Sequence, residues 1–367
     1  MPSTFLRALT GFAVGALFAG QALAAEEKVL NVYNWSDYIA EDTLAKFEAE
    51  TGIKVNYDVY DSNELLESKL LAGSSGYDIV VPTDHTFSRL IAAKILQKLD
   101  KSKIPNLVNL DPTLMARAAN YDPGNEHGII YMWGTNGLGI NVDKVKEVLG
   151  EDAPLDSYAL LFDPKYADKL ASCGIHVLDS ASEVFPVARN YLGLDPNSQS
   201  KEDLEKATEL WMGVRTDIQK FHSSEFINAL ANGDICMAFG FSGDILQAQS
   251  RAEEAGNGVN IEYIIPKEGS LVWFDMMGIP ADAPHPENAL AFINFILEPQ
   301  ITADISNYVW YANANIKSTP LVIEDVRNNP GVYPSAAVME KLFIQKTAGP
   351  KYERLRTRAW NKVKTGV

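Results

Sequence analysis

The sequence predicts an α/β fold in which a mostly parallel sheet carries helices on both faces. In the first hundred residues, short apolar runs that are typical of buried strands alternate with amphipathic stretches that are typical of helices. This strand-helix-strand order favours a parallel sheet covered on both sides. The length of 367 residues is that of two domains, or of one domain with two lobes.

The individual elements follow from local patterns. Predicted strands are apolar or alternate in polarity, whereas predicted helices carry apolar residues on one face. The first helix is expected to stop at Gly52, because glycine is favoured just after a helix end. The strands are expected at residues 29–33, 53–59, 77–82 and 235–239, and the helices at residues 41–51, 63–71, 87–94 and 288–297.

Three segments are expected to cross between two lobes. The glycine-rich stretch 131–141 is interpreted as two strands whose glycines form the turn between them. Residues 266–269 are interpreted as the return crossing and residues 308–315 as a third one. The predicted boundaries are residues 25–134 plus 267–311 for lobe 1 and residues 135–266 plus 312–367 for lobe 2.

Residues 1–24 have the pattern of a secretory signal peptide. Arg7 supplies the positive charge, residues 11–20 are apolar but too short to span a bilayer, and residues 22–24 form an Ala-Leu-Ala cleavage site. The residue directly after the cleavage point is not a cysteine, which argues against a lipoprotein anchor. We therefore expect the mature chain to be exported and soluble.

The charge of the chain restricts its partners. The formal net charge is −16, and loss of Arg7 with the signal peptide makes it −17. Such a chain is not expected to bind nucleic acid, which requires a basic surface. The acidic charge is compatible with a cationic ligand, and solubility is the alternative explanation.

The chain has two cysteines, Cys173 and Cys236. Two thiols that are far apart in an exported chain favour one disulfide, because the compartment is oxidising. The alternative is a pair of buried free thiols.

Motifs of catalysis and metal binding are missing from the sequence. The five histidines have no metal-ligand spacing, and there is neither a C-x-x-C motif nor a P-loop. Residues 240–244 resemble a nucleophile elbow but lack its final glycine. We therefore predict no catalytic residue, no metal site and no cofactor.

Loops that combine aromatic and acidic residues are the strongest local signals. Trp35 and Tyr38 follow the first strand, and three further loops place a carboxylate next to aromatic residues. A buried ammonium group must be matched by carboxylates and hydrogen bonds, and aromatic faces add about 0.5–2 kcal/mol each. Taken singly, each residue has an alternative role in core packing or helix capping. The acidic residues are Glu183, Asp244 and Asp275, and the further aromatic residues are Phe241, Trp273 and Tyr311.

Motifs in the same order along nearly the whole mature chain resemble those of periplasmic polyamine-binding proteins, the putrescine and spermidine receptors of ABC importers. The motifs are Val-Tyr-Asn-Trp-Ser-Asp-Tyr-Ile at 32–39, Gly-Tyr-Asp-Ile-Val-Val-Pro at 76–82, Tyr-Met-Trp-Gly-Thr at 131–135, Ile-Asn-Ala-Leu-Ala-Asn-Gly-Asp at 227–234, Ile-Pro-Lys-Glu-Gly at 265–269, Tyr-Ala-Asn-Ala-Asn at 311–315 and Arg-Thr-Arg-Ala-Trp at 356–360.

The resemblance implies a two-lobed periplasmic binding protein of type II. Each lobe would be a mixed sheet flanked by helices, and crossing strands would form a hinge that closes on the ligand. It also implies a monomeric, non-enzymatic receptor in the periplasm that delivers polyamines to an inner-membrane ABC permease.

The resemblance also implies the ligand-binding residues. Three carboxylates would meet the ammonium groups, four aromatic rings would enclose the carbon chain, and hydroxyl groups would add hydrogen bonds. The implied residues are Trp35, Ser36, Tyr38, Thr83, His85, Glu183, Phe241, Asp244, Trp273, Asp275 and Tyr311.

Three positions bear on which polyamine is preferred. Phe241 and Trp273 depart from the putrescine type, which carries tryptophan and phenylalanine there, and Trp273 matches the spermidine type. Ser180 replaces an extra carboxylate of the spermidine type. The tail and the Tyr-Ala-Asn-Ala-Asn run are closer to the putrescine type, so putrescine is favoured slightly over spermidine.

Three alternatives remain open at this stage. The first is a receptor for another small cation. The second is an exported two-lobed enzyme that uses Glu183 or Asp275 as a general acid or base. The third is a sensor that presents its closed form to a signalling partner.

Overall fold

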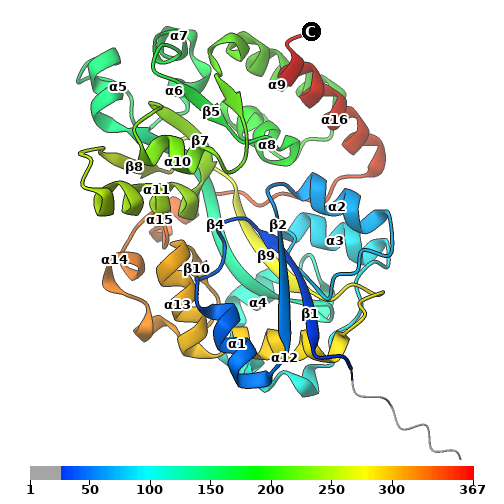
Figure 1. Cartoon of the computed structure of the whole chain (residues 1–367). Helices are drawn as coiled ribbons and strands as arrows, with labels where there is room; N and C mark the ends of the chain where they lie inside the picture. The colour runs from blue at the N-terminus through cyan, green and yellow to red at the C-terminus, as the bar shows by residue number, and fades with distance from the viewer. Residues whose placement is uncertain (1–25) are drawn as a thin grey trace, which may run out of the picture.

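The computed structural model describes residues 26–367, so the predicted signal peptide at residues 1–24 lies outside the described part. The described chain forms two α/β lobes joined by long strands (Figure 1). The sheet order is β2-β1-β3-β9-β4-β7-β5-β6, and β8 and β10 each pair with β4 outside this path. The strands are β1 Val29–Trp35, β2 Lys54–Tyr60, β3 Ile79–Val80, β4 Gly128–Asn141, β5 Ile175–Val177, β6 Lys220–Phe221, β7 Met237–Phe241, β8 Ile261–Ile264, β9 Val272–Gly278 and β10 Ala312–Asn313.

In the first lobe, β1 is the parallel partner of both β2 and β3, and β9 joins β3 in the antiparallel direction. The predicted helix end at Gly52 is confirmed: this glycine has a φ of 69° and its N–H donates to the carbonyl of Glu48. The helices of this lobe are α1 Thr43–Thr51, α2 Asn63–Leu71, α3 Asp84–Ala92, α4 Pro112–Ala118, α12 Pro286–Ile296 and α13 Pro299–Val309 (Figure 1).

In the second lobe, β5 is parallel to both β6 and β7, while β4 runs antiparallel to β7 and β8. The two-lobed α/β fold with mixed sheets is therefore confirmed. The helices of this lobe are α5 Val142–Leu149, α6 Ala159–Phe162, α7 Pro164–Leu170, α8 Ala181–Tyr191, α9 Lys201–Gly213, α10 Phe226–Ala231, α11 Ser242–Ala255 and α16 Pro350–Thr365 (Figure 1). Two short helices, α14 Glu324–Arg327 and α15 Ala336–Met339, precede α16.

The prediction of two strands with a glycine turn at 131–141 was wrong, because β4 is one continuous strand. Its first half pairs with β9 and its second half with β7 and β8. The glycines permit close packing instead of a turn: a Cβ on Gly134 would lie 2.9 Å from the Trp273 ring, and one on Gly137 would lie 2.4 Å from the carbonyl oxygen of Ile264.

Other boundaries differ at the ends of predicted elements. β1 extends through Trp35, so the first aromatic residue of the predicted loop lies on the strand. The strand predicted at 77–82 has ladder pairing only at Ile79–Val80, and α3 begins at Asp84 rather than at residue 87. The exact lobe boundaries stay a prediction; β10 pairs with Met132 and Trp133, beside the strands of the first lobe. Within residues 26–367, no helix combines the length and the apolar character that a membrane crossing requires.

The predicted disulfide is confirmed. Cys173 and Cys236 are bonded, with their Cα atoms 5.4 Å apart and a sequence separation of 63. The backbone N–H of Cys236 also donates to the carbonyl of Cys173 at 3.1 Å, so the bond joins the end of the α7 segment to the start of β7.

We expect reduction of this disulfide to destabilise the protein. A closed loop of this length contributes roughly 4 kcal/mol in the chain-entropy model, and often less in practice. Chemical unfolding of the wild type, with and without reductant, and of a Cys173→Ser/Cys236→Ser variant should show equal losses for reduction and substitution. Unchanged unfolding midpoints in both cases would contradict a stabilising role.

Candidate functional site

A cavity lies between the two lobes. Its walls combine carboxylates, hydroxyl groups and aromatic rings from both lobes. The lining residues are Trp35, Ser36, Tyr38, Asp61, Thr83, Glu183, Ser223, Phe241, Asp244, Trp273, Asp275 and Tyr311.

The topology explains why these residues meet. The strands β1, β2 and β3 are parallel in one lobe, and β5, β6 and β7 are parallel in the other. Loops at the carboxyl ends of all six strands contribute to the cavity. Ligands of open α/β sheets bind at this end of the strands.

Ten of the eleven predicted ligand residues line this cavity. His85 does not. It lies in the first turn of α3 with its ring buried, and neither ring nitrogen has a hydrogen-bond partner among the described residues. Burial, together with the positive charges of Arg89 and Arg356, holds the pKa of His85 well below its usual range.

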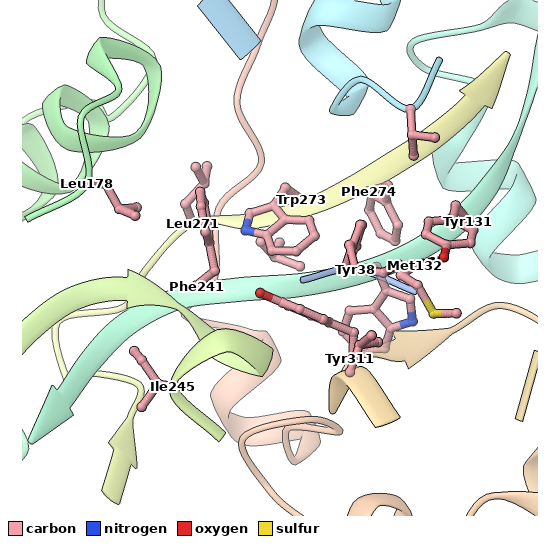
Figure 2. Packing of buried hydrophobic residues seen from close by; sticks show 14 of the residues in the cluster. Tyr38, Tyr131, Met132, Leu178, Phe241, Ile245, Leu271, Trp273, Phe274 and Tyr311 are labelled. Carbon is pink, nitrogen blue, oxygen red and sulfur yellow. Dashed lines mark hydrogen bonds between the residues drawn. The ribbon is translucent and has the colours of Figure 1, made fainter. Parts of the chain in front are cut away.

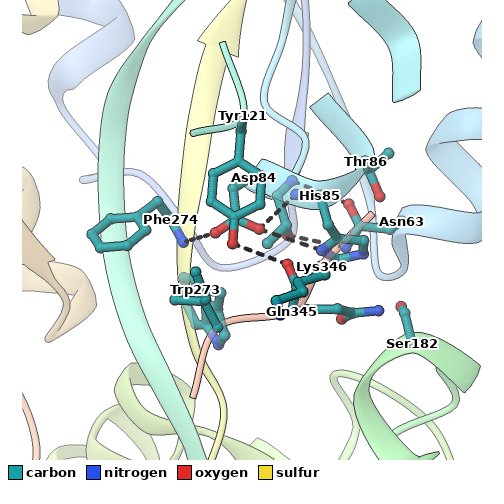
Figure 3. A network of polar contacts seen from close by, with 12 residues as sticks. Asn63, Asp84, His85, Thr86, Tyr121, Ser182, Trp273, Phe274, Gln345 and Lys346 are labelled. Carbon is teal, nitrogen blue, oxygen red and sulfur yellow. Dashed lines mark hydrogen bonds and ion pairs between the residues drawn. The ribbon is translucent and has the colours of Figure 1, made fainter. Parts of the chain in front are cut away.

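Figure 3 shows that His85 belongs to a network of polar contacts around Asp84. The carboxylate of Asp84 accepts hydrogen bonds from the backbone N–H groups of His85 (2.5 Å) and Phe274 (3.2 Å). The bond from Phe274 ties α3 to β9, the strand that carries Trp273 and Asp275.

Two lining residues, Asp61 and Ser223, were missed by the sequence reasoning. Asp61 directly follows β2, and Ser223 follows β6 by two residues. Their position after the carboxyl ends of parallel strands was the available signal. The strand predicted at residues 53–59 ended two residues before Asp61. No strand was predicted at the residues of β6, which precede Ser223.

Asp275 is a buried carboxylate at the centre of β9. Its Oδ1 accepts a hydrogen bond of 2.7 Å from the hydroxyl of Thr83, which Asn63 holds in turn. The Tyr38 hydroxyl lies near this carboxylate without reaching hydrogen-bonding geometry. Burial raises the pKa of Asp275 to about 8, and the bond from Thr83 opposes this rise.

Asp244 lies in the first turn of α11, directly after β7. Its Oδ1 accepts a hydrogen bond of 2.7 Å from the hydroxyl of Tyr311, and the same hydroxyl accepts one from the Asp244 backbone N–H at 3.2 Å. Burial raises the pKa of Asp244 to about 8; the Tyr311 bond lowers it and the charge of Asp37 raises it further.

Glu183 lies in the first turn of α8. Its Oε2 accepts a hydrogen bond of 2.7 Å from the side-chain amide of Asn136, and the oxygen of this amide accepts one of 2.8 Å from the indole of Trp273. Burial raises the pKa of Glu183 to about 7, and the Asn136 bond opposes this rise.

Aromatic rings connect these three carboxylates. Phe241 and Trp273 meet edge to face with centroids 5.8 Å apart, Trp273 and Tyr311 are 5.6 Å apart, and Tyr38 and Tyr311 are 4.9 Å apart. Figure 2 shows these rings gathered around β4 and β9. Trp35 extends the wall, 6.0 Å from Phe241, and its indole donates to the Val81 carbonyl.

The cavity wall therefore contains three buried carboxyl groups and no basic side chain among its described lining residues. Glu183, Asp244 and Asp275 are 2%, 6% and 3% exposed, and no described residue that lines the cavity is basic. Within residues 26–367, no cluster of three or more acidic, histidine or cysteine side chains has a geometry that would hold a metal ion. Buried carboxylates require an opposite charge, and aromatic faces attract organic cations.

The chain matches the family model described as bacterial extracellular solute-binding protein over residues 42–332. It is 54% identical over 361 residues to the putrescine-binding periplasmic protein PotF of Escherichia coli, with 98% of each chain covered. It is 52% identical to the putrescine-binding periplasmic protein SpuD of Pseudomonas aeruginosa, with both chains covered completely.

Solved structures show the same fold. A Listeria monocytogenes protein assigned to a spermidine/putrescine ABC transporter superposes with a TM-score of 0.83 at 32% identity, covering 92% of this chain and 99% of that one. These matches confirm the resemblance to periplasmic polyamine-binding proteins and the periplasmic location that it implied. The chain therefore belongs to the bacterial extracellular solute-binding proteins, a family of binding proteins rather than enzymes.

Proposed function

We propose that this chain is a periplasmic receptor that captures putrescine as a dication between its lobes and delivers it to an ABC importer in the inner membrane. One observation carries the proposal: three buried carboxylates and a ring of aromatic side chains surround a cavity whose described lining contains no basic residue. A linear diamine supplies two charges for the carboxylates and methylene groups for the rings.

The relatives support putrescine ahead of spermidine. Two proteins named as putrescine-binding are 54% and 52% identical to this chain, and a putrescine/agmatine-binding protein is 45% identical. A protein named as spermidine/putrescine-binding is 32% identical. We propose that spermidine is the second ligand and that the receptor is a monomer. We also propose that nucleic acid is not a partner, because the net charge of the chain is −16.

The proposal is tested by the ligand that the protein retains and binds. Native mass spectrometry of protein purified from the periplasm without added amine should reveal a bound diamine. Calorimetry of the emptied protein should then show one site for putrescine. Absence of putrescine binding, or chemical conversion of the amine by the pure protein, would overturn the proposal.

The Asp275→Asn substitution should weaken putrescine binding more than Ser36→Ala. Asp275 is buried, so loss of its charge leaves an ammonium group unmatched, which costs about 2–5 kcal/mol. A neutral hydrogen bond of the kind that Ser36 can offer contributes about 0.5–1.5 kcal/mol. Calorimetry on both variants checks the order; equal and small losses would place Asp275 outside the ligand site.

The Trp273→Phe substitution should shift the preference toward putrescine. The indole covers more of a long carbon chain and gives a stronger cation-π face than a phenyl ring. We expect the difference in binding free energy between spermidine and putrescine to change by about 1–2 kcal/mol in favour of putrescine, which the ratio of their dissociation constants measures. The control is Tyr333→Phe, which removes a hydroxyl from a ring outside the described cavity lining. An unchanged ratio with both affinities retained would assign Trp273 to packing alone.

Putrescine binding should strengthen as the pH rises from about 6 to 8. Burial raises the pKa of Asp244 and Asp275 to about 8 and that of Glu183 to about 7, so these groups hold protons in the empty cavity that a dication displaces. Affinity should rise by up to about tenfold per pH unit for each proton released. Calorimetry in buffers of different ionisation enthalpy measures this release.

The stability of the ligand-free protein should change in the opposite direction. The folded state binds more protons than the unfolded chain between the ordinary carboxyl pKa, near 4, and the raised values, so its free energy of unfolding should fall as the pH rises through this range. Affinity and stability that are both constant between pH 6 and 8 would contradict the role of these carboxyls.

A further inference from the structure

The carboxylate of Glu64 joins the two lobes beside the cavity without lining it. Glu64 lies in the first turn of α2 in the first lobe. Its Oε1 accepts hydrogen bonds from the backbone N–H of Ser182 at 3.1 Å and from the Ser182 hydroxyl at 3.2 Å, and its Oε2 accepts one from the Ser180 hydroxyl at 3.0 Å. Both serines lie at the start of α8 in the second lobe.

This contact caps α8 from the opposite lobe. Ser180 is the N-cap residue of this eleven-residue helix, yet its side chain does not bond to the helix backbone. Its hydroxyl donates to Glu64 instead, and Glu64 accepts from the free backbone N–H of Ser182. A carboxylate at a helix N-terminus is favourable because it satisfies free N–H groups and the positive end of the helix dipole.

The cap acts directly on the residue that contributes to the cavity. Ser182 and Glu183 are adjacent in the first turn of α8, and Glu183 lines the cavity whereas Glu64 does not. On its other side, Ser182 lies next to Gln345; in the amide orientation that satisfies both neighbours, Gln345 donates to the Ser182 carbonyl at 3.0 Å and accepts from Arg356 at 2.8 Å. Figure 3 shows Gln345 and Ser182 close to each other at this boundary.

A second contact joins two other helices of the lobes, α3 and α16. Arg89 of α3 forms a double hydrogen bond with Glu67 of its own lobe at 2.8 Å, and its Nη1 lies 3.7 Å from Glu353 of α16 in the second lobe. The contacts between α2 and α3 on one side and α8 and α16 on the other therefore form a polar seam that exists only while these helices are close together.

The charge of Glu64 makes this seam depend on the ligand. Closing the lobes brings a further carboxylate next to Glu183, on the side of a cavity that already contains three buried carboxylates. In the empty cavity this approach must be matched by protons on the buried carboxyl groups, and a bound cation removes that requirement. Capping of α8 is therefore favoured most when the cavity is occupied.

We propose that Glu64 is a positioning residue that holds the lobes closed over the bound cation by capping α8 across the cleft. The inference rests on the proposed function, because it requires a cationic ligand and lobe closure. Since the cap forms after the ligand has entered the open cleft, its loss should accelerate ligand release and leave association unchanged.

Stopped-flow measurement of putrescine binding, followed by the fluorescence of Trp35 and Trp273 in the cavity wall, tests this inference. Glu64→Gln keeps the side-chain shape but removes the charge, and should raise the dissociation rate about tenfold. Combining Glu64→Gln with Ser180→Ala and Ser182→Ala should add little to this rate, because all three changes break the same contact. The control is Glu202→Gln, which removes a carboxylate paired with Lys206 on the exposed face of α9 and should change neither rate.

The outcomes separate this inference from the proposed function. A wild type that does not bind putrescine would overturn the proposed function and the inference that depends on it. A wild type that binds putrescine, with an unchanged dissociation rate in a folded Glu64→Gln variant, would overturn the inference alone. An additive effect of the serine substitutions would also contradict it, because Glu64 would then act through another contact.

Discussion

Three buried carboxylates without a basic partner in the described cavity lining are the constraint on which the rest of this structure depends. Burial of uncompensated charge is unfavourable, and the raised pKa values of Glu183, Asp244 and Asp275 express this cost as retained protons. Each carboxylate accepts a hydrogen bond from a neighbouring side chain, which fixes its position but does not supply a positive charge. A cationic ligand of the kind proposed would supply this charge, independently of any contact with its carbon chain.

The fold supplies these carboxylates from both lobes. Asp275 lies on β9, which pairs with the first half of β4, whereas Asp244 follows β7, which pairs with the second half. Because β4 is continuous, it joins the sheets of the two lobes directly. The glycines of β4 allow Trp273 and other bulky side chains to pack against its backbone. An occupied cavity and the contacts between the lobes, including the cap that Glu64 places on α8, then favour the same closed arrangement.

Much of this arrangement follows from local sequence patterns. The apolar strands and the stop at Gly52 depend on neighbouring residues, and the structure confirms them. The resemblance to polyamine-binding proteins added the grouping of distant residues around one cavity. The continuity of β4 was not predictable in this way, because glycine is compatible both with a turn and with close packing in a strand. The contact between Glu64 and Ser182 depends on how the lobes approach each other, which no local pattern encodes.

The central claim is that the carboxylates of the cavity are matched by two ammonium groups of one ligand. Its most direct test is calorimetry with putrescine and with butylamine, which has the same four-carbon chain but only one ammonium group. The account predicts that butylamine loses about 2–5 kcal/mol of binding free energy relative to putrescine, because at least one buried carboxylate is left without its cation. Equal affinity for the two amines would contradict the account, since the carbon chain and aromatic rings alone would then explain binding.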